Sequence, residues 1–281
     1  MQPTLNDGHD LDARRDREGM DPVAPRARHR RVLRLLVLCL GILVGLGALG
    51  TMRLVDASCS PFAGRPCVRV LFLGNSYTYV NDLPTVFRNI ARAGGQNVAT
   101  GMVAAGGETL ADHAASAASA GAIRDSRWQF VVLQEQSEVP AIESARQTQM
   151  YPAVRSLAGE IRAADATPIL LQTWAHRDGL PADGMGYVEM QSAIDTGYAA
   201  IGDQLGVAVA PAGQAWETVL RQDPTIALWQ ADGSHPSAAG TYLAACVLYA
   251  RIFGASPVGI PDIEGFPVDL ARALQVIAGQ P

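Results

Sequence analysis

The sequence predicts an α/β fold, a three-layer α/β/α arrangement with a five-stranded parallel sheet in the middle. Short apolar runs alternate with longer segments of helical composition, and the chain has no internal repeat. Strands separated by helices favour a parallel sheet, because two parallel strands can be joined only by a long crossover. The 281 residues are 48% hydrophobic, which is enough for one substantial core.

The N-terminal region differs from the rest of the chain. Residues 1–34 are polar and charged, and they are predicted to form a disordered cytoplasmic tail. Residues 35–52 carry no charge, and as a helix they would be about 27 Å long, enough to cross a hydrocarbon core. Several arginines lie just before this segment and only Arg53 lies just after it, so the positive-inside rule places the main body outside the cytoplasm.

Two interpretations of residues 35–52 stay open. The segment is either an uncleaved signal anchor that holds the protein at the membrane, or a signal peptide whose removal leaves the protein secreted. A buried core helix is disfavoured, because the segment is apolar on every face and flanked by arginines. The linker at 53–67 contains Cys59 and Cys67, which either form a disulfide or remain two free thiols.

The main domain, residues 68–281, is predicted to begin with a buried strand. Residues 68–73 are apolar and partly β-branched, and the run ends at Gly74, a residue that tolerates a sharp turn. Similar runs predict four more strands, at 97–103, 130–133, 168–173 and 207–210.

Helices are predicted between and after these strands. The first ends at the stop signal Gly94-Gly95, and an Ala-rich helix begins at Leu110. Cys246 lies in the apolar pattern of the last long helix and is interpreted as a packing residue. The predicted helices are at 82–93, from 110 onward, at 144–164, 187–205 and 238–253, with a weakly helical tail from 269.

Composition excludes several functions. The chain contains no lysine, so a P-loop nucleotidase, a Schiff-base enzyme and any lysine nucleophile are excluded. The formal net charge is −5; residues 1–34 carry eight arginines against six acids, a net of +2, which leaves −7 for the remainder. An acidic body argues against a nucleic-acid partner.

Three residues suggest nucleophilic catalysis. Ser76 follows the first strand, and ligands of open α/β sheets bind beyond the carboxyl ends of the strands. A serine needs a base, and the base needs an acid that holds its tautomer. His235 and Asp232 lie three residues apart and can provide both, so Ser76 is the predicted nucleophile, His235 the base and Asp232 the orienting acid.

Acyl transfer also needs hydrogen-bond donors for the developing oxyanion. The predicted donors are the backbone N–H groups of Ser76 and Gly107, together with one side-chain amide from Gln134 or Gln136. Activity is expected to require a neutral imidazole and therefore to fall below roughly pH 6–7.

These segments resemble the SGNH hydrolases, also called GDSL-like esterases. The run 74–77 is similar to the family's first block, with Asn75 where many members have Asp; Gly107-Glu108-Thr109 is similar to the second, and Asp232 to His235 matches the DxxH block. The usual GxND block is absent. Residues 133–137 stand in its place, similar to subfamilies, including carbohydrate acetylesterases, in which a glutamine replaces the asparagine donor.

The resemblance implies a flavodoxin-like SGNH hydrolase fold, a serine esterase mechanism without a cofactor or metal, and Gln134 in preference to Gln136 as the donor. Asn75, Trp174 and His176 are predicted to bind substrate, although Trp174 is equally well explained as an aromatic cap over the core. His113 is interpreted as a structural hydrogen-bonding residue. A zinc site formed by three histidines lacks the usual ligand spacing.

The predicted function is hydrolysis or transfer of a small acyl group, with O-acetyl on an extracytoplasmic glycan or another envelope ester as the leading substrate. One alternative is a lipid or lysophospholipid esterase, because the shape of the pocket determines which acyl chain fits. The other is a catalytically silent carbohydrate-binding module on the same fold. The predicted partners are a small-molecule or polysaccharide ester, with the membrane contacted only through the N-terminal segment. The sequence does not predict an oligomeric state.

Overall fold

The computed structural model describes residues 59, 64–125, 127–261 and 264–280, all of which belong to one compact unit, Gly50–Pro281. The tail and the apolar segment predicted within residues 1–52 lie outside the described residues, as does most of the linker. Among the described helices, none combines the length and hydropathy needed to cross a bilayer.

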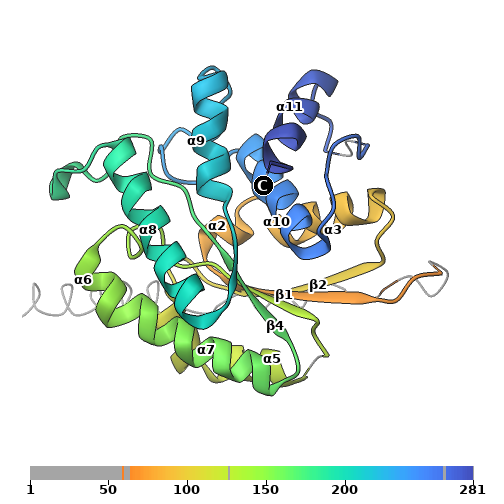
Figure 1. Ribbon diagram of the computed structural model, residues 1–281, viewed down its shortest axis with the longest axis vertical. Coiled ribbons are helices and arrows are strands. Elements are labelled where there is room, and N and C mark those ends of the chain that lie inside the picture. Colours follow the sequence, from red (N-terminus) through yellow and green to blue (C-terminus); the bar gives the residue numbers. More distant parts are fainter. Residues whose placement is uncertain (1–58, 60–63, 126, 262–263, 281) are drawn as a thin grey trace, which may run out of the picture. The chain divides into compact units, whose positions relative to one another are not determined.

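The centre of the domain is a five-stranded parallel sheet with the strand order β2-β1-β3-β4-β5, which confirms the predicted architecture (Figure 1). The chain leaves β1 first toward β2 and later returns to β3 on its other side. The ends of β1 and β3 therefore form the topological switch point at which ligands of such sheets bind. The strands are β1 (Val68–Gly74), β2 (Val98–Ala104), β3 (Phe130–Leu133), β4 (Thr167–Leu171) and β5 (Ala208–Ala210).

Alternation along β1 divides the core into two halves. Val70 and Phe72 belong to the core on one face of the sheet, and Leu71 and Leu73 belong to the core on the other. Each face is covered by helices (Figure 1). The first half is completed by α3 (Leu83–Ala93), α9 (Ala212–Gln222), α10 (Ala238–Phe253) and α11 (Val268–Ala278), and the second by α4 (Leu110–Ala115), α5 (Ala117–Asp125), α7 (Tyr151–Ala163) and α8 (Tyr187–Leu205).

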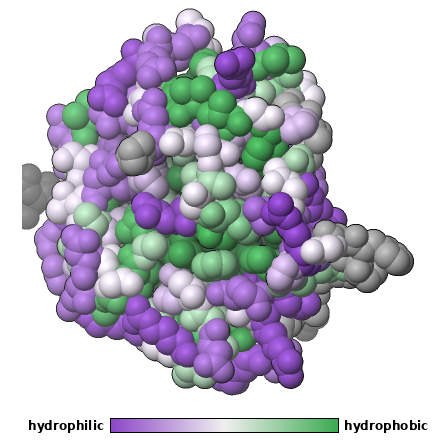
Figure 2. Space-filling view, turned by 45° about the vertical axis from the view of Figure 1, so that its right-hand side comes forward, coloured by the Kyte–Doolittle hydropathy of each residue, from purple (hydrophilic) through white to green (hydrophobic). Residues whose placement is uncertain are grey.

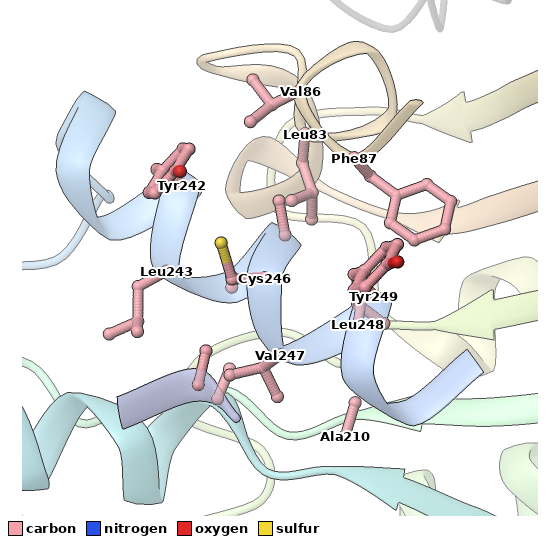
Figure 3. Packing of buried hydrophobic residues seen from close by; sticks show 14 of the residues in the cluster. Leu83, Val86, Phe87, Ala210, Tyr242, Leu243, Cys246, Val247, Leu248 and Tyr249 are labelled. Carbon is pink, nitrogen blue, oxygen red and sulfur yellow. The ribbon is translucent and has the colours of Figure 1, made fainter. Parts of the chain in front are cut away.

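Among the helices that complete the first half of the core, α10 is the most deeply buried. Its residues from Ala239 to Tyr249 are all buried, which agrees with its near-continuous apolar sequence. Figure 3 shows its side chains packed toward Leu83 and Phe87 of α3. Cys246 is buried in this cluster and forms no disulfide, so its interpretation as a packing residue is confirmed.

Two helical segments differ from the predictions. The helix expected at 144–164 consists of α6 (Glu143–Ala145), a π-helical turn at Arg146–Met150, and α7. Pro152 at the start of α7 has no N–H to continue a regular α-helix, which explains the wider turn before it. Helix α9 was not predicted, although its buried positions 212, 215, 216 and 219 have helical spacing.

Cys59 and Cys67 form a disulfide, with Cα atoms 5.7 Å apart, so the disulfide alternative is confirmed. The bridge ties the chain to the start of β1.

On the face shown in Figure 2, hydrophobic surface is interrupted and surrounded by hydrophilic residues. Within the described part of the chain, the exposed large hydrophobic side chains are Tyr79, Val188, Val258, Val268 and Val276.

Candidate active site

Ser76 is held in a tight turn at the end of β1. The Asn75 N–H donates to Gln134 Oε1 over 3.0 Å, and Asn75 Oδ1 accepts from the Tyr77 N–H over 3.1 Å, which caps the short helix α2 (Ser76–Tyr79). A Cβ at position 74 would collide with Thr78 Oγ1 and Gln134 Oε1, so only glycine fits there.

Ser76, His235 and Asp232 form one connected hydrogen-bond chain. His235 Nε2 lies 2.9 Å from Ser76 Oγ, and His235 Nδ1 lies 2.7 Å from Asp232 Oδ2. The Ser234 N–H lowers the pKa of the Asp232 carboxyl, and the side chain and N–H of His235 lower it further. The ionised carboxylate accepts the Nδ1–H, which leaves Nε2 as the acceptor for the serine proton.

The loop that carries the histidine is fixed by its own aspartate. Asp232 Oδ1 accepts hydrogen bonds from the Ser234 N–H, 2.9 Å away, and the His235 N–H, 3.0 Å away. Gly233, between Asp232 and Ser234, has φ +73°, and its carbonyl accepts from the Arg177 N–H over 2.7 Å. Asp232 therefore sets both the shape of the loop and the orientation of the imidazole.

A stack of three aromatic rings, Tyr77, Trp174 and Trp216, supports the loop that carries His235. Tyr77 stacks on Trp174 with ring centroids 4.8 Å apart, and Trp174 stacks on Trp216 at 4.0 Å. The Tyr77 hydroxyl lies 2.7 Å from Ser234 Oγ, while Trp174 Nε1 donates to the Ser234 carbonyl over 3.1 Å. Burial raises the pKa of Tyr77 to about 12, so its hydroxyl stays protonated.

Trp174 is only 1% exposed and does not reach the pocket. Its contacts all serve the core and the His235 loop. This corrects the prediction that Trp174 binds substrate, and it supports the alternative interpretation as a cap over the core. Asn75 borders the pocket but is 2% exposed, and its Nδ2 donates to the Glu108 carbonyl over 3.0 Å, so its side chain mainly holds the turn.

A cavity of about 430 Å³ opens above the serine. Its wall contains Ser76 and His235 from the hydrogen-bonded chain, Gly107 from the loop after β2, and Gln136 from the loop after β3. No aliphatic side chain lines it; every lining residue is glycine, polar, charged or tyrosine. The loops after β1, β2 and β3 and the loop before α10 therefore meet at one rim of the sheet.

The two glutamines have different surroundings. Gln134 is 1% exposed, and its amide donates to Asn75 Oδ1 at 3.0 Å and to the Glu135 carbonyl at 2.5 Å. Both amide protons are therefore used inside the protein, which leaves none for a substrate. This corrects the preference for Gln134 as the oxyanion donor.

Gln136 instead lines the cavity. Its Oε1 accepts from the backbone N–H groups of Glu138 at 2.7 Å and Val139 at 3.1 Å, which fixes the orientation of the amide. Its Nε2 makes only a long contact of 3.5 Å to Ser137 Oγ. Gln136 is the glutamine that has a donor available.

Two backbone donors also border the cavity. In the described part of the chain, neither the Ser76 N–H nor the Gly107 N–H has a protein acceptor. Gly107 has φ +72°, a conformation that favours glycine and turns this loop toward the pocket. Both groups can therefore serve as oxyanion donors.

The remaining histidines have separate roles. His113 is fully buried, with Nε2 2.9 Å from the Gly74 carbonyl and Nδ1 2.8 Å from Ser119 Oγ, so the structural interpretation is confirmed. His176 lines the cavity, with Nε2 3.0 Å from Ser137 Oγ, and burial lowers its pKa. Among the described residues, no group of three His, Cys, Asp or Glu side chains is placed to hold a metal ion.

Several solved structures are similar to this domain. A protein from Slackia heliotrinireducens, described as a candidate SGNH hydrolase, has 30% identity and a TM-score of 0.58, covering 66% of this chain and 100% of its own. A DUF4886 family protein from Bacteroides uniformis has 18% identity and a TM-score of 0.67, covering 76% of this chain and 94% of its own.

A third similar structure is a mutant of Axe2, an acetyl-xylooligosaccharide esterase from Geobacillus, with 17% identity and a TM-score of 0.51, covering 66% of this chain and 94% of its own. At this identity the likeness concerns the fold alone. No protein-family model and no curated protein matches the sequence.

Proposed function

Because this chain belongs to the SGNH hydrolase superfamily, we propose that it is a serine esterase that forms an acyl-enzyme on Ser76. The observation that carries the proposal is the connected chain from Asp232 through His235 to Ser76, with distances of 2.7 and 2.9 Å. Nucleophile, base and orienting acid are each within hydrogen-bond reach of the next, as acyl transfer requires.

In the proposed reaction, Ser76 Oγ attacks the ester carbonyl carbon while His235 Nε2 takes the hydroxyl proton. The N–H groups of Ser76 and Gly107 and the Gln136 Nε2 stabilise the oxyanion. The bond from carbon to the alcohol oxygen then breaks, and His235 gives its proton to the leaving alcohol. A water molecule then attacks the acyl carbon while His235 takes its proton. The bond from that carbon to Ser76 Oγ breaks, and His235 returns the proton to Oγ, which releases the carboxylic acid and restores Ser76.

The lining of the cavity favours a small acyl group and a polar alcohol. A long acyl chain is bound through apolar contact, and no aliphatic side chain lines this cavity. His176 and Tyr79 at the wall provide a hydrogen-bonding imidazole and an exposed ring, groups suited to a carbohydrate. We therefore place an O-acetylated glycan first among substrates and a lipid ester second.

We also propose that the catalytic domain acts outside the cytoplasm, held by residues 35–52 as an anchor or released after their cleavage. The proposal is supported by the arginines that precede this apolar segment. It is also supported by the Cys59–Cys67 disulfide, a bond that persists in oxidising compartments.

A chain-length series tests the substrate class. We expect kcat/KM to be highest for p-nitrophenyl acetate, lower for the butyrate and lowest for the palmitate, with acetate released from acetylated xylan. Ser76→Ala serves as the control for non-enzymatic hydrolysis. Preference for the palmitate would instead favour the lipid esterase, and hydrolysis of none of these esters would favour a silent binding module.

A further inference from the structure

Glu135 is a buried carboxyl group that the proposed mechanism does not use. Its side chain is fully buried, and its Oε1 accepts two backbone hydrogen bonds, from the Leu110 N–H over 3.0 Å and from the Gln136 N–H over 2.7 Å. Its Oε2 is also buried and has no hydrogen-bond partner in the described part of the chain.

This arrangement is costly for stability. Burying a carboxyl group with one unsatisfied oxygen is unfavourable, and a hydrophobic side chain of similar size often stabilises such a position. Burial raises the pKa of Glu135 to about 7, a direct consequence of that cost. A reason other than core packing is therefore needed for the presence of a carboxyl group at this position.

The two partners of Glu135 Oε1 lie on the two loops that flank the nucleophile. Leu110 begins α4 and directly follows the loop that contains Gly107, after β2. Gln136 lies on the loop after β3. Because β1 lies between β2 and β3, these loops stand on either side of Ser76, and one carboxylate oxygen binds both.

We propose that Glu135 is a positioning residue. By binding the backbone of both loops, it holds the Gly107 N–H and the Gln136 side-chain Nε2 at the separation required to bind one oxyanion. This inference depends on the proposed esterase function and adds the element that determines the geometry of its oxyanion hole. Donors on two separate loops stabilise an oxyanion only when the loops keep a fixed distance, and a misplacement of about 1 Å can reduce a rate about 100-fold.

The test removes the bridge from each side separately. Glu135→Met removes the acceptor at similar volume, and Glu135→Gln keeps an acceptor oxygen in the same place. Leu110→Pro removes the N–H donor at the first position of α4, where proline is well tolerated, and Leu110→Ala controls for the lost side chain. Each variant is assayed with p-nitrophenyl acetate, and its thermal unfolding is followed by circular dichroism.

We expect Glu135→Met to lower kcat about 10- to 100-fold with KM within about twofold, and Glu135→Gln to restore most of the rate. Leu110→Pro should lower kcat by a similar factor relative to Leu110→Ala. The double variant Glu135→Met/Leu110→Pro should lose little more than either single variant, because both remove the same bridge.

Equal kcat for Glu135→Met and wild type would overturn the inference while leaving the esterase proposal intact. Equal losses in the Met and Gln variants, or additive losses in the double variant, would also overturn it. If the wild-type protein hydrolyses no ester, the proposed function itself fails, which is a different result from an active enzyme that is insensitive to Glu135.

Discussion

His235 Nε2 lies 2.9 Å from Ser76 Oγ, although the two residues are 159 positions apart in the sequence. The sheet brings them together, because Ser76 follows β1 and the His235 loop precedes α10, which packs against α3 over the same face. The aromatic stack beneath the loop and the Asp232 side chain within it hold the imidazole in place.

Replacing Asp232 with Asn should reduce kcat strongly. The carboxylate accepts the His235 Nδ1–H, whereas an amide N–H at that position would favour the opposite tautomer, with Nε2 protonated toward Ser76. A loss on the order of 10³- to 10⁴-fold is expected for such a change in a serine triad. Steady-state kinetics with p-nitrophenyl acetate measures it, and a loss below about tenfold would argue against the assigned role of Asp232.

Gln136→Ala and Gln134→Ala should separate catalysis from stability. We expect Gln136→Ala to lower kcat about 10²- to 10³-fold without a change in the unfolding temperature, because only an oxyanion donor is lost. Gln134→Ala leaves the buried Asn75 N–H and Thr78 hydroxyl without their acceptor, at a cost of about 2–5 kcal/mol of unfolding free energy.

Kinetics and urea unfolding of both variants provide the measurement. The reverse pattern, with a stable but inactive Gln134 variant and an unaffected Gln136 variant, would restore Gln134 as the donor.

Trp174→Ala should destabilise the protein by about 3–5 kcal/mol, because the indole is sandwiched between Tyr77 and Trp216. Trp174→Phe should keep much of the stack and lose the hydrogen bond to the Ser234 carbonyl. A lower kcat with unchanged KM is then expected, since the histidine loop and not the substrate is affected. A raised KM at constant kcat would indicate direct contact between Trp174 and the substrate.

Glu135 should make stability depend on pH. Its pKa is raised from 4.5 to about 7, so the folded protein binds more protons than the unfolded chain between these values. Unfolding free energy is therefore expected to decrease as pH rises from about 4.5 to 7, by about 3 kcal/mol from this group alone. The negative charge of Asp112 on α4 also raises the pKa of Glu135, and the Tyr198 side chain on α8 faces the same carboxyl group.

Glu135→Gln isolates this contribution. Urea unfolding at pH 5 and pH 8 should show the variant gaining about 3 kcal/mol relative to wild type at the higher pH. An equal pH dependence in both proteins would mean that Glu135 is ionised in the folded state near its ordinary pKa.

The sheet and the hydrogen-bonded chain from Asp232 through His235 to Ser76 could be predicted from the sequence because their signals are local. The apolar run of β1 ends at Gly74, a residue type that is common where a strand turns, and only two residues separate Asp232 from His235 in one loop. The apolar residues of α9 have helical spacing and could have predicted this helix. Pro211 and Gly213 at its start are residue types that are typical of turns, which is why the helix was not predicted.

The choice between the glutamines depended on register beyond the end of β3. The Gln134 N–H still donates to the Leu73 carbonyl, over 2.9 Å, so strand alternation continues past Leu133. Gln134 therefore points into the turn beside β1, and Glu135 points toward α4 and α8. Composition cannot show where a strand stops pairing, and for the same reason the burial of Trp174 past the end of β4 could not be predicted.

The central claim is that Ser76 is the activated nucleophile, and labelling with a fluorophosphonate tests it most directly. Intact mass spectrometry followed by peptide mapping should find one phosphonyl group on Ser76 of the wild-type protein, and none on Ser76→Ala or after denaturation. An unlabelled wild-type protein, a label on another residue, or full esterase activity in Ser76→Ala would contradict the account.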